Sequence, residues 1–129
     1  YRVSLIVKLI LDISKQGGRL EIYSIRNILY LRPSGIINPI LIKEDLKAAM
    51  IFGLMNPNGW DYIIDTENVL FPNPMNLFYL KEIKKLPNLN QYIIYAPKPV
   101  VRILQKMTSL IMKPDKILTY QEELDKYLV

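Results

Sequence analysis

Carboxylates are the side chains of this sequence that come closest to a catalytic set. The 129 residues include neither histidine nor cysteine. The chain therefore lacks the usual general base near neutral pH, the thiolate nucleophile and the commonest transition-metal ligands. A hydrolase or lyase would have to use Asp65 or Glu67 as its base, with Lys or Tyr in support. We therefore expect no catalytic residues, no metal site and no cofactor. An enzyme that uses Asp65 as its base is the least favoured of the functions considered below.

The sequence also contains few features that would indicate phosphate or nucleic-acid binding. The five glycines never reach the spacing of a nucleotide-binding loop. Lys98, Arg102 and Lys106 step by four and would share one helix face, which could steer an acidic protein, a nucleic acid or a membrane surface, or could simply be solvated. Base-stacking aromatics do not interleave with these cations, so no nucleic acid is expected, and nothing further supports a membrane surface.

A polar loop follows an apolar run ending at residue 64. It opens with Asp65 and Thr66, and Asn73 precedes Pro74 in the arrangement typical of a helix start. In a parallel sheet, partners are met where the strands end, which makes this loop the first candidate for a binding site. The alternative is that Asp65 and Asn73 only satisfy backbone donors in a tight loop.

Short apolar runs alternate with longer amphipathic segments, which predicts an α/β fold with a mixed, largely parallel sheet of about five strands covered by helices. At 15.1 kDa the chain fits one domain of this kind. The expected elements are, in order, strands at 19–24 and 28–31, a helix at 42–55, a strand at 62–65, a helix at 74–86, a strand at 92–95, a helix at 99–110, a strand at 117–118 and a last helix ending at 128.

The first 18 residues are expected to form an extra amphipathic helix. Ser4, Lys8, Asp12 and Lys15 recur at helical spacing among apolar residues, and glycines at 17 and 18 would end the helix. Its wide apolar face either packs across the sheet or binds a partner. In the second case the partner could be another copy of this chain, which would form a homodimer through this helix.

The apolar opening predicts neither a membrane span nor a secretion signal. It is too short and too charged to cross a bilayer, and it lacks a small-residue cleavage pattern. The absence of cysteine suits a reducing compartment. We therefore expect a cytoplasmic protein.

The run from 65 to 77, Asp-Thr-Glu-Asn-Val-Leu-Phe-Pro-Asn-Pro-Met-Asn-Leu, resembles the signature of the STAS domain, the fold of bacterial anti-sigma-factor antagonists. In that signature an Asp-Leu-Ser-Gly-Val-x-Phe run leads into Asp-Ser-Ser-Gly-Leu. Asp65, Val69, Phe71 and Leu77 match in register. Residues 73–76 depart from it, because Asn-Pro-Met-Asn replaces the Asp-Ser-Ser-Gly that carries the phosphorylated serine.

The resemblance implies a STAS-like domain at 19–129, acting as a non-catalytic regulatory module that docks a protein partner without serine phosphorylation. Its alternative is a small-ligand or lipid-binding module linked to a transporter, as some STAS-like relatives are. The partner-binding residues it suggests, together with the basic helix face, are Asp65, Thr66, Asn73, Met75, Asn76 and Arg102.

Overall fold

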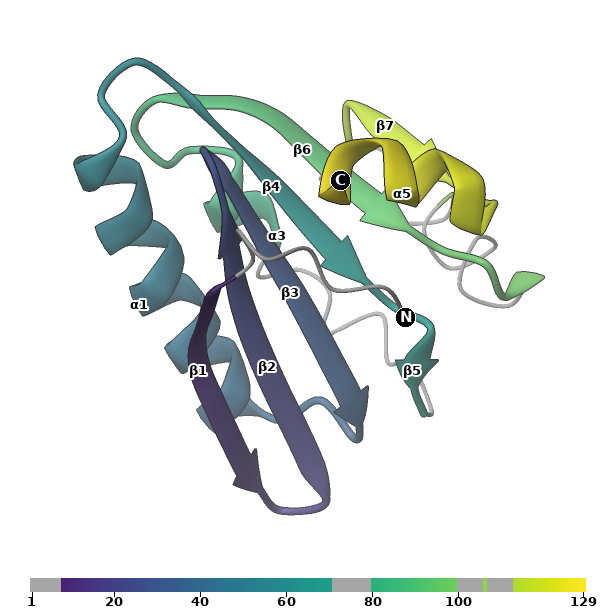
Figure 1. The fold of residues 1–129 in the computed structure, drawn as a ribbon. Helices are drawn as coiled ribbons and strands as arrows, with labels where there is room; N and C mark the ends of the chain where they lie inside the picture. Colours follow the sequence, from purple (N-terminus) through teal and green to yellow (C-terminus); the bar gives the residue numbers. More distant parts are fainter. Residues whose placement is uncertain (1–7, 71–79, 100–105, 107–112) are drawn as a thin grey trace.

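The computed structural model describes residues 8–70, 80–99, 106 and 113–129. Within these ranges three opening strands are followed by three helices, with a pair of strands between each helix and the next (Figure 1). Their bounds are β1 (Lys8–Lys15), β2 (Gly18–Ile25), β3 (Ile28–Gly35), α1 (Pro39–Met55), β4 (Trp60–Asp65), β5 (Asn68–Val69), α3 (Leu80–Ile83), β6 (Leu89–Tyr95), β7 (Lys116–Leu118) and α5 (Gln121–Leu128).

One mixed sheet of seven strands organises the molecule, in the order β1-β2-β3-β4-β6-β7, with β5 paired to the end of β3. The β1–β2 and β2–β3 pairs are antiparallel, whereas β3–β4, β3–β5, β4–β6 and β6–β7 are parallel. The predicted α/β class with a largely parallel sheet is confirmed. The two strands beyond the expected five are β1 and β5.

Helices cover both faces of this sheet (Figure 1). Under α1 and α3 lies a core that includes Leu41, Ala49 and Ile83, and the opposite face packs beneath Leu124 and Leu128 of α5. None of the helices in the described ranges is long and apolar enough to cross a membrane. Side chains of β2, β3, β4 and β6 alternate between the two cores, as expected for strands that are covered on both faces.

The predicted N-terminal helix is wrong for residues 8–15, which form the edge strand β1. A bulge between Leu9 and Leu11 breaks its register with β2 and leaves Ile10 as the extra residue. That extra apolar residue hides the period of two that a strand shows. β1 pairs along β2 from Lys8 to Lys15, so these residues belong to the same sheet as the strands that follow them. The dimer expectation loses the helix on which it rested.

Most of the other predicted elements are confirmed with shifted bounds. The hairpin extends from residue 18 to 35, and β3 runs through Pro33 because that residue lies beyond the last pair of β3 with β4, at Leu31. Helix α1 starts at Pro39, where the Asn38 side chain accepts hydrogen bonds from the Ile40 and Leu41 amides. Of the helix expected at 74–86, the structure describes residues 80–86, of which Leu80–Ile83 form α3, whereas most of the helix expected at 99–110 lies outside the described residues.

Gly35 is the last residue of β3, and we expect its substitution by alanine to destabilise the fold. Its φ is +72°, and a Cβ there would lie 2.4 Å from the Gly17 carbonyl oxygen. The left-handed conformation and the clash together predict that Gly35→Ala lowers the free energy of unfolding by about 2 to 4 kcal/mol. Urea unfolding followed by circular dichroism measures this change.

Gln16→Gly is the matched control, because Gln16 occupies the adjacent turn with φ +50° and glycine tolerates that conformation. We expect this variant to stay within about 1 kcal/mol of the parent. Equal unfolding midpoints for Gly35→Ala and the parent chain would contradict the prediction.

Candidate functional site

The buried carboxylate of Asp65 organises the carboxyl edge of the parallel strands. Only 4% of the residue is exposed. Its Oδ2 accepts a hydrogen bond of 2.5 Å from the Tyr30 hydroxyl and lies 3.7 Å from Nε of Arg32, both on neighbouring β3. Its Oδ1 accepts from the Glu67 backbone amide at 2.9 Å. The carboxylate therefore ties the end of β4 to β3 and shapes the turn that follows.

Burial is the largest influence on the pKa of the Asp65 carboxyl and raises it above its ordinary value of 3.8. The Tyr30 hydrogen bond, the Glu67 amide and the Arg32 guanidinium oppose that shift. Both carboxylate oxygens are occupied by these groups. The arrangement supports a turn and offers no geometry for a catalytic base.

Thr66 is held inward in the same turn. It is 4% exposed, and both its backbone amide and its hydroxyl donate to the Tyr95 carbonyl, at 3.0 and 2.8 Å. The Val69 amide then donates to the Thr66 carbonyl, and the Leu70 amide to the Gly35 carbonyl at 2.8 Å. These bonds join the ends of β3, β4 and β6, so the turn has a defined path across the edge.

Three apolar side chains exposed at this edge were not selected from the sequence. Leu70 is 52% exposed directly after β5, Ile36 is 46% exposed after β3, and Tyr120 is 67% exposed after β7. All three follow strands that are parallel to one another and end at this edge of the sheet. An apolar residue following a polar turn was the one sequence feature that could have revealed Leu70. We call Ile36, Leu70 and Tyr120 the edge patch.

The other predicted site residues are not brought together by the described structure. Asn73, Met75, Asn76 and Arg102 lie outside the described residues. Lys98, from the predicted basic face, is half-buried and Lys106 is exposed. In the ranges described, no three Asp or Glu side chains gather where they could hold a metal ion.

The fold and the anchored turn define a mixed α/β domain whose parallel strands end at a surface suited to recognition. No family model matches the sequence, and no curated protein matches it either. Among solved structures, the chain resembles an anti-sigma factor antagonist from Mycobacterium paratuberculosis with a TM-score of 0.65 and 16% identity, over 86% of this chain and 93% of that one. This likeness shows the STAS-like fold, in agreement with the resemblance carried by residues 65–77.

The raised pKa of Asp65 predicts how its contribution to stability changes with pH. Between pH 3.8 and the raised value, the folded chain holds a proton that the unfolded chain has lost, so stability falls as the pH rises. Relative to Asp65→Asn, the parent chain should lose stability on going from pH 3.5 towards neutrality. The difference in unfolding free energy between the two proteins should change by at most about 1.4 kcal/mol per pH unit.

Urea unfolding of both proteins at matched pH values tests this, because the difference cancels the titration of other groups. Asp12→Asn is the control, since its exposed bond to Arg19 lowers the pKa of that carboxyl and gives the opposite sign. A stability difference for Asp65→Asn that grows in the parent's favour with rising pH would contradict the assignment.

Proposed function

We propose that this chain is a non-catalytic regulatory module of STAS-like type that docks a protein partner at the carboxyl edge of its sheet. The observation that carries the proposal is the anchored turn after β4, in which Asp65 and Thr66 are buried while Leu70 is 52% exposed. The predicted binding roles of Asp65 and Thr66 are thereby refined: they position the docking surface from beneath. The anti-sigma factor antagonist with the same fold supports a regulatory role.

Preorganisation is what such a turn contributes to binding. An exposed loop loses conformational freedom when it docks, and a loop already fixed by hydrogen bonds loses less. The turn here is fixed by the Asp65 carboxylate, the Thr66 hydroxyl and the Leu70 amide. An exposed apolar side chain such as Leu70 can become buried on binding, and a few such buried side chains provide most of the affinity of a protein interface.

Docking in this proposal does not depend on serine phosphorylation. The sequence places no serine between residues 65 and 77. Thr66, the nearest hydroxyl, is 4% exposed and donates to the Tyr95 carbonyl, which keeps it from a kinase in the folded chain. The module therefore docks constitutively or under another control. We extend the surface to Asn73, Met75 and Asn76, which follow this turn in the chain.

The partner in this proposal is a cytoplasmic protein with acidic groups near its own apolar anchor. Arg102 and Lys106 belong to the stretch expected to supply the complementary charge, and Lys106 is exposed. Charges at the rim of such an interface chiefly raise the association rate and fall in effect as salt increases.

Photo-crosslinking tests this surface. With a photo-reactive amino acid at position 70 of the full chain, expressed in its native host, we expect one dominant cross-linked protein that mass spectrometry identifies. Leu70→Asp, at an apolar anchor, should then weaken binding of that purified protein by at least about tenfold in a titration.

Leu54→Asp provides the matched control, because Leu54 is similarly exposed at 66% but lies near the end of α1, away from the carboxyl edge. Its affinity for the same partner should equal that of the parent. Equal affinities for Leu70→Asp and Leu54→Asp would contradict docking through the edge patch.

The alternative function, a small-ligand module, is favoured by one separate observation. An apolar cavity lies between β1 and α1, and its lining includes neither Leu70 nor any other residue of the edge patch.

A further inference from the structure

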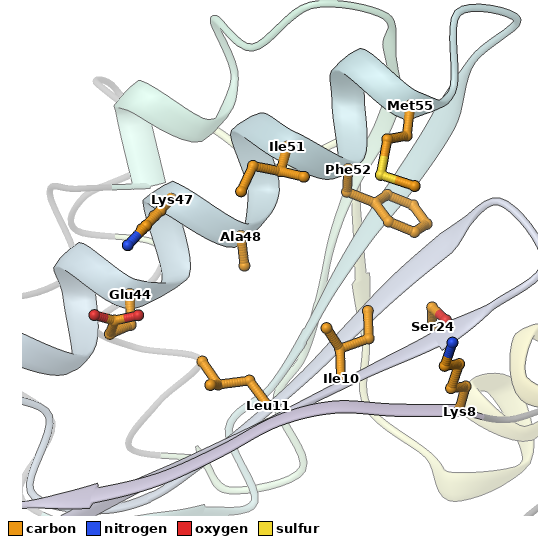
Figure 2. A pocket seen from close by; sticks show the side chains of 10 residues that line it. All are labelled: Lys8, Ile10, Leu11, Ser24, Glu44, Lys47, Ala48, Ile51, Phe52 and Met55. Carbon is orange, nitrogen blue, oxygen red and sulfur yellow. The ribbon is translucent and has the colours of Figure 1, made fainter.

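A cavity of about 390 Å³ lies between the edge strand β1 and helix α1, and most of the side chains around it are apolar (Figure 2). Three of them remain substantially exposed to solvent, namely Ile10 at 48%, Ile51 at 51% and Met55 at 73%. The residues around the cavity are Lys8, Ile10, Leu11, Ser24, Glu44, Lys47, Ala48, Ile51, Phe52 and Met55.

The bulge in β1 creates the apolar floor of this cavity. In a regular strand, consecutive side chains point to opposite faces of the sheet. Because the register shifts between Leu9 and Leu11, Ile10 and Leu11 both face α1 and line the cavity. Ala48 faces them from α1 with a side chain of one carbon, which leaves the space open (Figure 2). The hollow therefore follows from two specific features of the sequence.

Polar groups stand at the ends of this apolar lining. Lys8 is paired with Ser24 across the β1–β2 ladder, and Figure 2 shows both beside the cavity at the end near Phe52. Glu44 and Lys47 flank the other end on α1. The lining thus carries two positive charges and one negative charge. An elongated apolar site with a cation and a hydroxyl at one end is complementary to an alkyl chain with an anionic head group.

We propose that this cavity binds a medium-chain alkyl carboxylate, with the carboxylate at Lys8 and Ser24 and the chain along Ile10, Ala48 and Ile51. Its volume falls at the lower end of the range of about 300 to 1,000 Å³ for small-molecule sites. The proposal is independent of docking at the edge patch.

Chain length is the first test. Titration calorimetry with hexanoate, octanoate and decanoate, each below its critical micelle concentration, should give affinities that rise about fourfold for each added methylene while the cavity fills. 1-Decanol should bind more weakly than decanoate. Affinities that do not change with chain length, or a decanol that binds as well as decanoate, would overturn the proposal.

The second test removes the positive charge at the proposed head-group end of the site. Lys8→Gln should weaken decanoate binding about threefold, as expected for an exposed charge, and leave 1-decanol binding unchanged. Lys43→Gln is the matched control, because Lys43 is an exposed lysine of α1 that does not line the cavity. Equal effects of the two substitutions on decanoate would contradict the placement of the head group.

A third pair of variants tests the apolar part. Ile51→Asn should weaken decanoate binding at least tenfold, whereas Leu54→Asn, at a similarly exposed position outside the lining, should not. Both positions are exposed, so both variants are expected to stay folded.

If decanoate fails to bind the parent, and sedimentation shows a dimer that Ile51→Asn dissociates, the face is an interface with a second copy and the proposal is wrong. Leu70→Asp should leave decanoate binding unchanged, which separates failure here from failure of the docking proposal.

Discussion

The cost of burying the Asp65 carboxylate is the constraint on which the carboxyl edge depends. An ionised carboxyl inside a protein needs hydrogen-bond donors or a cation around it, and Tyr30 and Arg32 on β3 supply them. These partners stand on the neighbouring strand, so the alignment of β3 with β4 decides whether the carboxylate is satisfied. Beneath α1, the hydroxyl of Tyr62 donates to the buried Asp45 at 2.6 Å. Buried tyrosine–aspartate pairs thus fix β3 to β4 on one face and α1 to β4 on the other.

The sequence was sufficient where hydrophobic periodicity was undisturbed, as in the β2–β3 hairpin, β4, β6 and α1. It failed at β1 because the bulge at Ile10 places two successive apolar residues on one face, and this imitates helical spacing. Strand β5 was also missed, since its two residues are paired only because the Asp65 turn returns the chain to β3. Both failures have tertiary causes, and each of these features contributes to a proposed site.

Asp65 was selected from the sequence as a partner-binding residue, and the burial of its side chain could not be predicted. Residue type suggests that an Asp in a polar loop is exposed, whereas burial here depends on Tyr30, which is 35 residues earlier in the sequence. A similar distance in sequence explains why the exposure of Leu70 was not predicted. Its exposure results from the bond between its amide and the Gly35 carbonyl, a contact between distant segments. Surfaces of this kind are defined by strand pairing and cannot be obtained from local sequence alone.

The geometry around Thr66 also bears on how docking is controlled. A phosphate on its hydroxyl would break the bond to the Tyr95 carbonyl and add a charge of about −2 one residue from the Asp65 carboxylate. Burial and the carboxylates of Glu67 and Asp65 already raise the pKa of the Tyr95 phenol, which indicates that added negative charge is unfavourable there. Such a modification would disrupt the turn that presents Leu70. A reversible switch needs two folded states of similar free energy, and modification of Thr66 would instead remove the folded edge itself.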